Sequence, residues 1–327
     1  MSHDSLGPRP VDRALDPDFR YGQSTEPNYS GAVSFLRRVY AHDLSGFDVA
    51  VWGVPLDTSV SNRPGARFGP RALRDASTIL DGDPVYPFGA DIFEKLAVAD
   101  TGDAVFDYGY PAEMPEAIET QAAVRLAEGV HLVSLGGDHF ITYPVLKALT
   151  KRIGGPVALI QFDAHQDTWD DKDGRIDHGT FVTRLVREGV IAPEKSIQIG
   201  IRTHAPADYG IEIVDGYDVA RLGSEGVARR IKARVGDMPA YITFDIDCLD
   251  PAFAPGTGTP VCGGLSSREA LSILMGLESL NLKGFDVVEV SPPYDHANVT
   301  ALAGATLAHY YLGLLARRKA AGLPIAP

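Results

Sequence analysis

The amino-acid sequence predicts an α/β fold in three layers, with a mainly parallel sheet of roughly eight strands between two layers of helices. Two observations predict this class. Apolar runs of strand length alternate with helix-like segments along almost the whole chain, which is typical of strands joined by crossover helices. The strand candidates are apolar on both faces, as burial under two helix layers requires. We expect an N-terminal arm over residues 1–30 and a single domain over residues 31–327.

Eight segments have the length and the β-branched or aromatic composition of strands. They lie at residues 48–54, 95–100, 131–135, 156–162, 196–201, 212–214, 240–244 and 285–290. No internal repeat, linker or low-complexity tract separates them, so we expect them all in one domain.

The segments between these strands carry helix signals at their ends. Pro70 stands at a first helical position, where its missing N–H leaves no hydrogen bond unmade. Gly129 and Gly189 stand where a glycine commonly ends a helix. The expected helices span residues 70–74, 114–128, 142–153, 180–188, 225–235, 267–280 and 300–318.

The last of these helices contains few strongly polar residues between Ala301 and Ala316. A membrane span is therefore the alternative interpretation. Glycines, Thr306 and His309 dilute its apolar character, and it is short for a span. We expect a buried helix or a subunit contact instead.

Composition restricts the possible functions. The chain has 327 residues, of which 45% are hydrophobic, so a large core is possible. Its two cysteines exclude a disulfide framework, and we expect Cys248 to be a buried structural thiol. The net charge of −13 argues against nucleic acid or an anionic membrane surface as a partner. The polar first thirty residues lack the apolar region of a signal peptide, so a cytoplasmic protein is expected.

Metal-binding residue types follow three of the predicted strands. Asp163, His165 and Asp167 come directly after residues 156–162, and alternation along an extended chain would point all three the same way. Asp245 and Asp247 follow the strand at 240–244. His139 and its neighbour Asp138 follow the strand at 131–135. In parallel sheets, ligands bind beyond the carboxyl ends of the strands, where all of these residues lie.

Each of these residues alone would more often cap a helix or a turn. Together they bring four carboxylates and two imidazoles to one place, and burying that much negative charge without a cation is prohibitive. The sequence therefore predicts a bimetallic site, with ligands His139, Asp163, His165, Asp167, Asp245 and Asp247. Asp138 is expected to cap a loop or to support a ligand.

Several motifs resemble the ureohydrolase family, which includes arginases and agmatinases. They are Gly-Gly-Asp-His at 136–139, Asp-Ala-His-Gln-Asp at 163–167, Asp-His-Gly at 177–179, Asp-Ile-Asp-Cys-Leu-Asp-Pro at 245–251, Ala-Pro-Gly-Thr-Gly-Thr-Pro at 254–260 and Glu-Val-Ser-Pro at 289–292. The resemblance runs from about residue 48 to the C-terminus, and residues 236–260 and 284–308 look most like the agmatinases.

This resemblance implies an arginase-like fold with two Mn²⁺ ions per chain. One ion would be bound by His139, Asp163, Asp167 and Asp245, and the other by Asp163, His165, Asp245 and Asp247. An oxygen-rich ligand set suits Mn²⁺ better than it suits thiolate-preferring metals. In the family picture, a hydroxide that bridges the metals attacks the guanidinium carbon, and Asp167 passes its proton to the departing amine.

Two further residues are implied to take part in the reaction. Glu289 would bind the guanidinium ion through charge-assisted hydrogen bonds, and His178 would move protons beside the site. The implied substrate is a small cationic guanidine, agmatine, which would be cleaved to putrescine and urea. Family members are commonly trimers or hexamers, so a homo-oligomer is expected.

Residues 168–177 are expected to lie over the site and to contact the substrate tail. Their four aspartates favour the ammonium end of agmatine. Lys172 and Arg175 would instead favour a guanidino acid, such as 4-guanidinobutanoate or 3-guanidinopropanoate. More remote alternatives are a metal-dependent amidohydrolase or deacylase, which would leave Glu289 unpaired, and an inactive assembly subunit.

Overall fold

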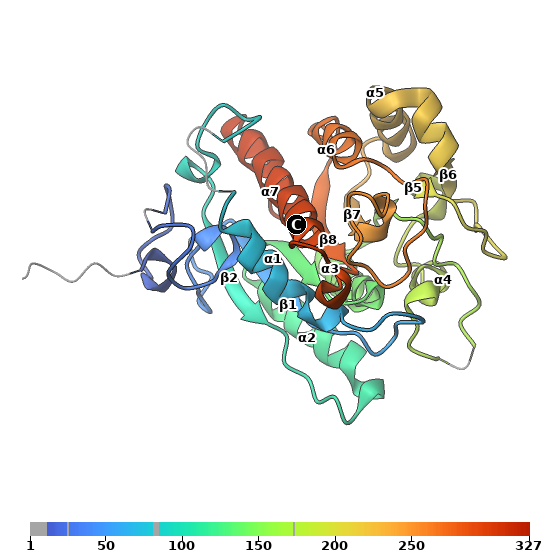
Figure 1. Cartoon of the computed structure of the whole chain (residues 1–327), viewed down its shortest axis with the longest axis horizontal. Helices are drawn as coiled ribbons and strands as arrows, with labels where there is room; N and C mark the ends of the chain where they lie inside the picture. The colour runs from blue at the N-terminus through green and yellow to red at the C-terminus, as the bar shows by residue number, and fades with distance from the viewer. Residues whose placement is uncertain (1–11, 25, 81–84, 173) are drawn as a thin grey trace, which may run out of the picture.

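A computed structural model describes residues 12–24, 26–80, 85–172 and 174–327 of the chain (Figure 1). Eight parallel strands form one sheet in the order β2-β1-β3-β8-β7-β4-β5-β6. The strands are β1 Val49–Val54, β2 Val98–Asp103, β3 His131–Gly136, β4 Ala158–Phe162, β5 Ile197–Ile201, β6 Glu212–Asp215, β7 Ala240–Asp245 and β8 Leu282–Val288. The three-layer, mainly parallel fold predicted from the sequence is confirmed.

Seven α-helices of the described residues cover the two faces of the sheet. They are α1 Gly69–Ser77, α2 Met114–Ala127, α3 Thr142–Ile153, α4 Phe181–Arg187, α5 Gly216–Val235, α6 Ser267–Met275 and α7 Val299–Ala320. Apolar side chains of α1, α5, α6 and α7 form the core on one face, and those of α2, α3 and α4 form the core on the other. Figure 1 shows α7 running beside α1 and α6 across the first of these faces.

Most predicted elements are present, but several of their bounds were wrong. Strand β2 begins at Val98 rather than at residue 95. The backbone N–H of Ala97 donates to the side-chain carboxylate of Asp48 and therefore not to a neighbouring strand. Helix α5 begins at Gly216, and the break at Gly223, with φ +64°, explains why only its second half was predicted. Helix α6 ends at Met275, well before residue 280.

The end of β8 matters most for the site. The strand runs over Leu282–Val288, so Glu289 lies just beyond it instead of within it. Glu289 has a φ of +63°, a left-handed conformation that cannot continue a strand. Its carboxylate is therefore aimed by a turn in the backbone and not by strand alternation.

Helix α7 is long and apolar enough to cross a membrane by length and composition alone, and it is the one such helix among the described residues. However, 78% of its most apolar window is buried inside the protein. It packs on α1, α6 and β8, as expected for a core helix.

The described part of the N-terminal arm packs on the domain. The Ala14 carbonyl accepts a hydrogen bond from the backbone N–H of Tyr40 at 2.8 Å. The buried Arg37 side chain donates to the carbonyls of Pro27 and Ser30. Residues 1–11 of the predicted arm lie outside the described residues, and the division at residue 30 stays a prediction.

Candidate metal centre

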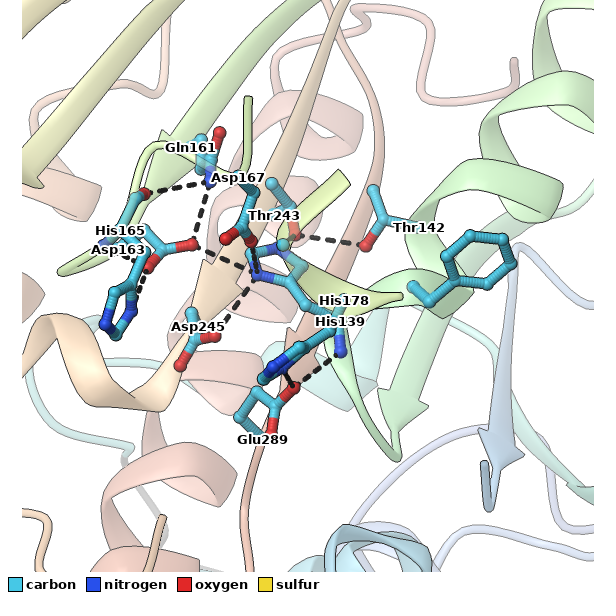
Figure 2. Close-up of polar contacts among 12 residues, drawn as sticks. His139, Thr142, Gln161, Asp163, His165, Asp167, His178, Thr243, Asp245 and Glu289 are labelled. Carbon is cyan, nitrogen blue, oxygen red and sulfur yellow. Dashed lines mark hydrogen bonds and ion pairs between the residues drawn. The ribbon is translucent and has the colours of Figure 1, made fainter. Parts of the chain in front are cut away.

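The predicted ligands and Glu289 lie at the carboxyl ends of four neighbouring strands in the middle of the sheet. His139 follows β3, Glu289 follows β8, Asp245 ends β7, and Asp163 follows β4. The order β3-β8-β7-β4 therefore brings segments from four distant parts of the sequence to one edge. Figure 2 shows their side chains converging at this edge.

The three metal-type residues after β4 do not converge by alternation along a strand. They lie in the loop that follows Phe162, and Asp167 has a φ of +52°. This left-handed turn directs Asp167 toward His139, whereas His165 faces Asp247. The interpretation that one extended segment presents all three to one point was wrong, because the loop divides them between two groups.

The first group surrounds the Nδ1 atom of His139. This atom lies 3.1 Å from Oδ2 of Asp163 and 3.1 Å from Oδ2 of Asp167. Oδ2 of Asp245 lies 3.2 Å from it. All four side chains are almost completely buried.

The second group consists of Asp163, His165 and Asp247. Its donor atoms lie within 4.8 Å of one another, as do those of His139, Asp163 and Asp167 in the first group. His165 Nδ1 is 3.1 Å from Oδ2 of Asp247 and 3.4 Å from Oδ1 of Asp163. Asp163 thus belongs to both groups, as a bridging ligand would. Asp245, the second expected bridge, contacts His139 but lies outside both three-residue groups.

A hydrogen-bonded chain fixes which nitrogen of His139 can bind a cation. Asp286, fully buried in β8, accepts a hydrogen bond from the Thr243 hydroxyl at 2.6 Å. Because that hydroxyl donates to the carboxylate, it accepts from Nε2–H of His139 at 2.8 Å. The neutral imidazole therefore carries its proton on Nε2 and turns the Nδ1 lone pair toward the three aspartates (Figure 2).

The charges of this cluster are not balanced by protein groups alone. Burial, followed by the charge of Asp163, raises the pKa of Asp167 to about 6. Burial and neighbouring aspartates raise the pKa of Asp245 well above its usual range. Burial opposes a charge on His139, but the three carboxylates around Nδ1 still raise the pKa of this imidazole well above its ordinary value. One imidazole nitrogen cannot satisfy three carboxylates, so the donor set fits divalent cations, which would hold all four aspartates ionised.

Glu289 and His178 form a second polar group next to this cluster. Oε1 of Glu289 accepts the backbone N–H of His139 and lies 2.9 Å from Nδ1 of His178. The Oε2 atom is buried and has no hydrogen-bond partner among the described residues. A buried carboxylate oxygen without a donor is costly, and a bound cation would remove that cost.

Neighbouring carboxylates and Ser61 act on the proton of His178 in opposite directions. Burial is the largest single influence and disfavours the charged form, but the carboxylates of Glu289, Asp167 and Asp138 together raise the pKa of His178 to about 10. The backbone N–H of Ser61 lies 3.1 Å from Nε2, and because an N–H only donates, it favours an unprotonated Nε2. The Ser61 hydroxyl, 2.8 Å from the same atom, can donate or accept. Nδ1 thus keeps its proton toward Glu289, and Nε2 is the atom at which a proton is gained or lost.

A cavity of about 570 Å³ opens above the cluster. It is lined by Ser61, His165, Asp167, Trp169, Asp170, Asp171, Lys172, Arg175, Asp177, His178, Gly179, Thr180, Pro206, Asp245 and Thr259. The loop at 168–177 therefore covers the site, as predicted. Glu289, only 1% exposed, is absent from this lining among the described residues and lies behind His178.

The aspartates of that loop are already paired with arginines. The pairs are Asp170 with Arg187, Asp171 with Arg184, and Asp177 with Arg175. Asp173 lies outside the described residues. Lys172 takes part in no ion pair among the described residues. The prediction that these aspartates are available to an ammonium group is therefore weakened.

The sequence interpretation missed several residues that support the ligands. Thr243, Asp286 and Gln161 are polar residues inside otherwise apolar strands, and that contrast is the signal that could have identified them. Gln161 donates to Oδ2 of Asp163 at 2.8 Å. Ser61 had no such signal, because it is an exposed loop residue 117 positions from His178. Asp138 caps the turn after β3 by accepting the N–H of Phe140, as expected.

Comparisons with known proteins identify the family. The Arginase family model matches residues 47–313. An agmatinase of Chromobacterium violaceum is 48% identical over 303 residues, which cover 92% of this chain and 94% of that protein. A crystal structure of a hypothetical agmatinase from Burkholderia thailandensis has a TM-score of 0.93 and 49% identity, and the match covers 95% of this chain and 98% of that one.

A second solved structure is similar over nearly the same length. The proclavaminate amidino hydrolase from Streptomyces clavuligerus has a TM-score of 0.85 and 37% identity, covering 89% of this chain and 99% of that one. The resemblance inferred from the sequence motifs, and the arginase-like fold that it implied, are both confirmed by these matches. With a family model spanning most of its length and relatives close to half identical, this chain belongs to the arginase family.

Proposed function

We propose that this protein is a ureohydrolase that hydrolyses agmatine to putrescine and urea. The observation that carries the proposal is the buried Oε2 atom of Glu289, which has no donor among the described residues and lies beside a cluster of candidate metal ligands. A guanidinium ion presents N–H groups in a planar fork that suits a carboxylate. Relatives called agmatinase, 48% and 49% identical to this chain, support agmatine as the guanidine.

Two Mn²⁺ ions per chain are the proposed cofactor. His139, Asp163, Asp167 and Asp245 would hold one ion, and Asp163, His165, Asp245 and Asp247 the other. The oxygen-rich donor set supports Mn²⁺, and no thiol contributes to it. When bound, the metal pair supplies Lewis-acid activation of water near neutral pH.

The side chains around the metals divide the remaining work. Glu289 holds the guanidinium ion, with Oε1 fixed by the backbone of His139 and Oε2 left for the substrate. Asp167 accepts the proton that the attacking water gives up and passes it to the departing amine. His178 exchanges a proton with solvent at Nε2, because its Nδ1–H is held by Glu289. The C–N bond to the tail breaks, and the water oxygen becomes the urea oxygen.

A guanidino acid is the second candidate substrate. The three described loop aspartates are ion-paired, whereas Lys172 takes part in no ion pair among the described residues and lines the cavity. This arrangement favours a carboxylate at the substrate tail. The relative called proclavaminate amidino hydrolase supports this alternative, because the substrate in its name is a carboxylate.

The test is urea release by Mn²⁺-loaded protein, with kcat/KM compared for agmatine, 4-guanidinobutanoate, 3-guanidinopropanoate and arginine. We expect agmatine to give the highest value. A higher value for a guanidino acid would support the same hydrolysis reaction, with Lys172 binding the carboxylate at the substrate tail. No urea from any of the four would overturn the proposal.

The proposal extends to the state of the protein in the cell. We expect a cytoplasmic homo-oligomer of three or six chains, as is common in the family. Light scattering of the purified protein would measure the mass, and a monomer of 35.0 kDa would contradict this expectation.

A further inference from the structure

We infer that Arg202 is a positioning residue that builds the second metal position by fastening the Asp247 loop to the loop of Asp163 and His165. Arg202 is the first residue after β5 and is half-buried beside the turn that carries Asp247. None of the sequence motifs or ligand groups includes it. The inference rests on the proposed metal centre and concerns only one half of it.

The guanidinium group of Arg202 donates its hydrogen bonds to backbone carbonyls. Nη2 donates to the carbonyl of Asp247 at 2.6 Å and to that of Val261 at 2.8 Å. Nη1 donates to the carbonyls of Gly200 at 2.9 Å and Cys248 at 3.3 Å. Further contacts run from Nε to Val261 at 3.2 Å and from Nη2 to Leu249 at 3.3 Å.

These acceptors come from three separate segments. They are the end of β5, the turn that carries Asp247, and the segment that leads from Thr259 to Val261. In the described residues Arg202 forms no ion pair with a carboxylate, so these carbonyls occupy its donors. A buried carbonyl without a donor is costly, so the turn would rearrange if the guanidinium were removed.

The backbone of Arg202 holds the other ligand loop. Its N–H donates to the carbonyl of Ala164 at 3.0 Å. Ala164 stands between Asp163 and His165, and its own N–H donates to Oδ1 of Asp247 at 3.1 Å. A closed ring of hydrogen bonds therefore joins Arg202, Ala164 and Asp247.

This ring joins the two residues that belong only to the second ligand group, His165 and Asp247. The third member of that group, Asp163, lies on the same loop as His165 but is shared with the first group. His139 is held by a different chain through Thr243 and Asp286. Loss of the Arg202 fork should therefore weaken the second metal selectively.

The neighbouring segment is shaped to admit this side chain. A Cβ at Gly264 would lie 2.6 Å from Nη2 of Arg202 and 2.5 Å from the backbone nitrogen of Asp250. Glycine is thus required where this segment passes over the guanidinium. Lysine cannot replace the fork, because its single ammonium has three donors and no planar geometry.

The experiment compares Arg202→Lys and Arg202→Gln with wild type after loading with Mn²⁺ and gel filtration. Metal per chain is counted by mass spectrometry, binding is titrated by calorimetry, and electron paramagnetic resonance separates coupled Mn²⁺ pairs from isolated ions. Asp247→Asn provides the single-metal reference. Arg234→Lys is the matched control, because Arg234 also donates to backbone carbonyls of Ser196 and Pro193, but at the opposite end of β5.

We expect both Arg202 variants to keep one tightly bound Mn²⁺ and to bind the second about 10- to 100-fold more weakly. Their spectra should change from coupled to isolated ions, while Arg234→Lys keeps two. Wild-type affinity for both ions in both variants would overturn the inference. So would parallel loss of both ions and of the thermal transition, which would show a general structural role. Wild-type protein that binds fewer than two ions would instead overturn the proposed metal centre.

Discussion

Glu289 combines three unusual features in a single residue. Its backbone has a φ of +63°, which costs about 1–3 kcal/mol for a residue other than glycine. It is buried, and one of its carboxylate oxygens has no partner among the described residues. The surrounding backbone holds it in place, since its N–H donates to the Gly137 carbonyl at 2.8 Å and its Oε1 accepts the N–H of His139. Strain and an open acceptor at one position indicate a binding function.

Replacing Glu289 by glutamine keeps the shape and removes the charge. A charge-assisted hydrogen bond contributes about 1.5–3 kcal/mol, so we expect kcat/KM for agmatine to fall about 10- to 150-fold. Both metal ions should remain, because Glu289 belongs to neither ligand group. Kinetics and metal counts on Glu289→Gln check this, with Glu188→Gln as a control on a carboxylate that contacts Tyr143 and Lys147 and belongs to neither ligand group. Loss of a metal would move Glu289 into the ligand set.

At this scale the sequence predicted the candidate ligands but not how they are arranged. Asp163, His165, Asp245 and Asp247 were found because each follows an apolar strand, and strand ends of a parallel sheet share one edge. The left-handed turn at Asp167 leaves no mark in a single sequence, because its conformation depends on contacts made across the sheet.

At the scale of the elements, the pairing of β7 with β8 positions the two residues that orient His139. Thr243 of β7 is paired directly with Asp286 of β8, so the hydroxyl lies within reach of the carboxylate. Tyr241 and Thr142 donate to the same carboxylate at 2.7 and 2.9 Å. Three hydroxyl donors thus hold a buried carboxylate that has no cationic partner among the described residues, and through Thr243 they orient the imidazole.

Thr243→Val keeps the shape of the side chain but removes the acceptor for Nε2–H of His139. The imidazole then loses the contact that fixes its tautomer, and we expect metal affinity to fall about 10- to 100-fold. Titration of metal-free protein with Mn²⁺ measures this. Thr243→Ser, which retains the hydroxyl, should bind nearly as well as wild type. Equal affinity of the valine and serine variants would contradict the assigned role.

Element bounds were predictable where a local signal ends the element. Helix α3 has the bounds that the sequence predicted, and in the structure Gly154, with φ +81°, ends it. Helix α6 ends at Met275 because Gly276 is its C-cap, a local signal that the predicted end at residue 280 passed over. Gly276 also packs against α5, where a Cβ would come within 2.6 Å of Cβ of Ala228.

At the scale of the whole molecule, His131 joins the sheet to the last helix and to the C-terminal segment. Its Nδ1 contacts the Ile325 carbonyl at 2.7 Å, and its Nε2 contacts the Tyr311 hydroxyl at 2.7 Å. Complete burial is the main cause that lowers the pKa of His131 to about 4. The unfolded chain, with a pKa of about 6.5 at this residue, therefore binds more protons between pH 4 and 6.5.

It follows that the stability contributed by neutral His131 is complete above pH 6.5 and is lost as the pH falls toward 4. We expect the difference in unfolding free energy between wild type and His131→Gln to shrink by about 2 kcal/mol between pH 7.5 and pH 5.0. Urea unfolding at the two pH values measures it. The exposed His296, changed to glutamine, should leave the pH dependence of wild type intact. Parallel pH curves for wild type and His131→Gln would rule out this coupling.

Metal removal tests whether the cluster at the sheet edge is part of the folded state as a whole. Four buried aspartates lie within one cluster, and the folded protein must hold their charges together whereas the unfolded chain separates them. A cation that binds only the folded form stabilises it, by about 2.7 kcal/mol per site at 100 times the dissociation constant. We therefore expect chelation at pH 8 to lower the unfolding midpoint and Mn²⁺ to restore it. Asp163→Asn lacks the ligand that both groups share, so most of that shift in the unfolding midpoint should be absent in this variant. This control excludes effects of the chelator that are unrelated to the site. If the wild-type midpoint were the same with and without metal, these aspartates would have to be neutralised by protons instead, and the proposed metal centre would be wrong.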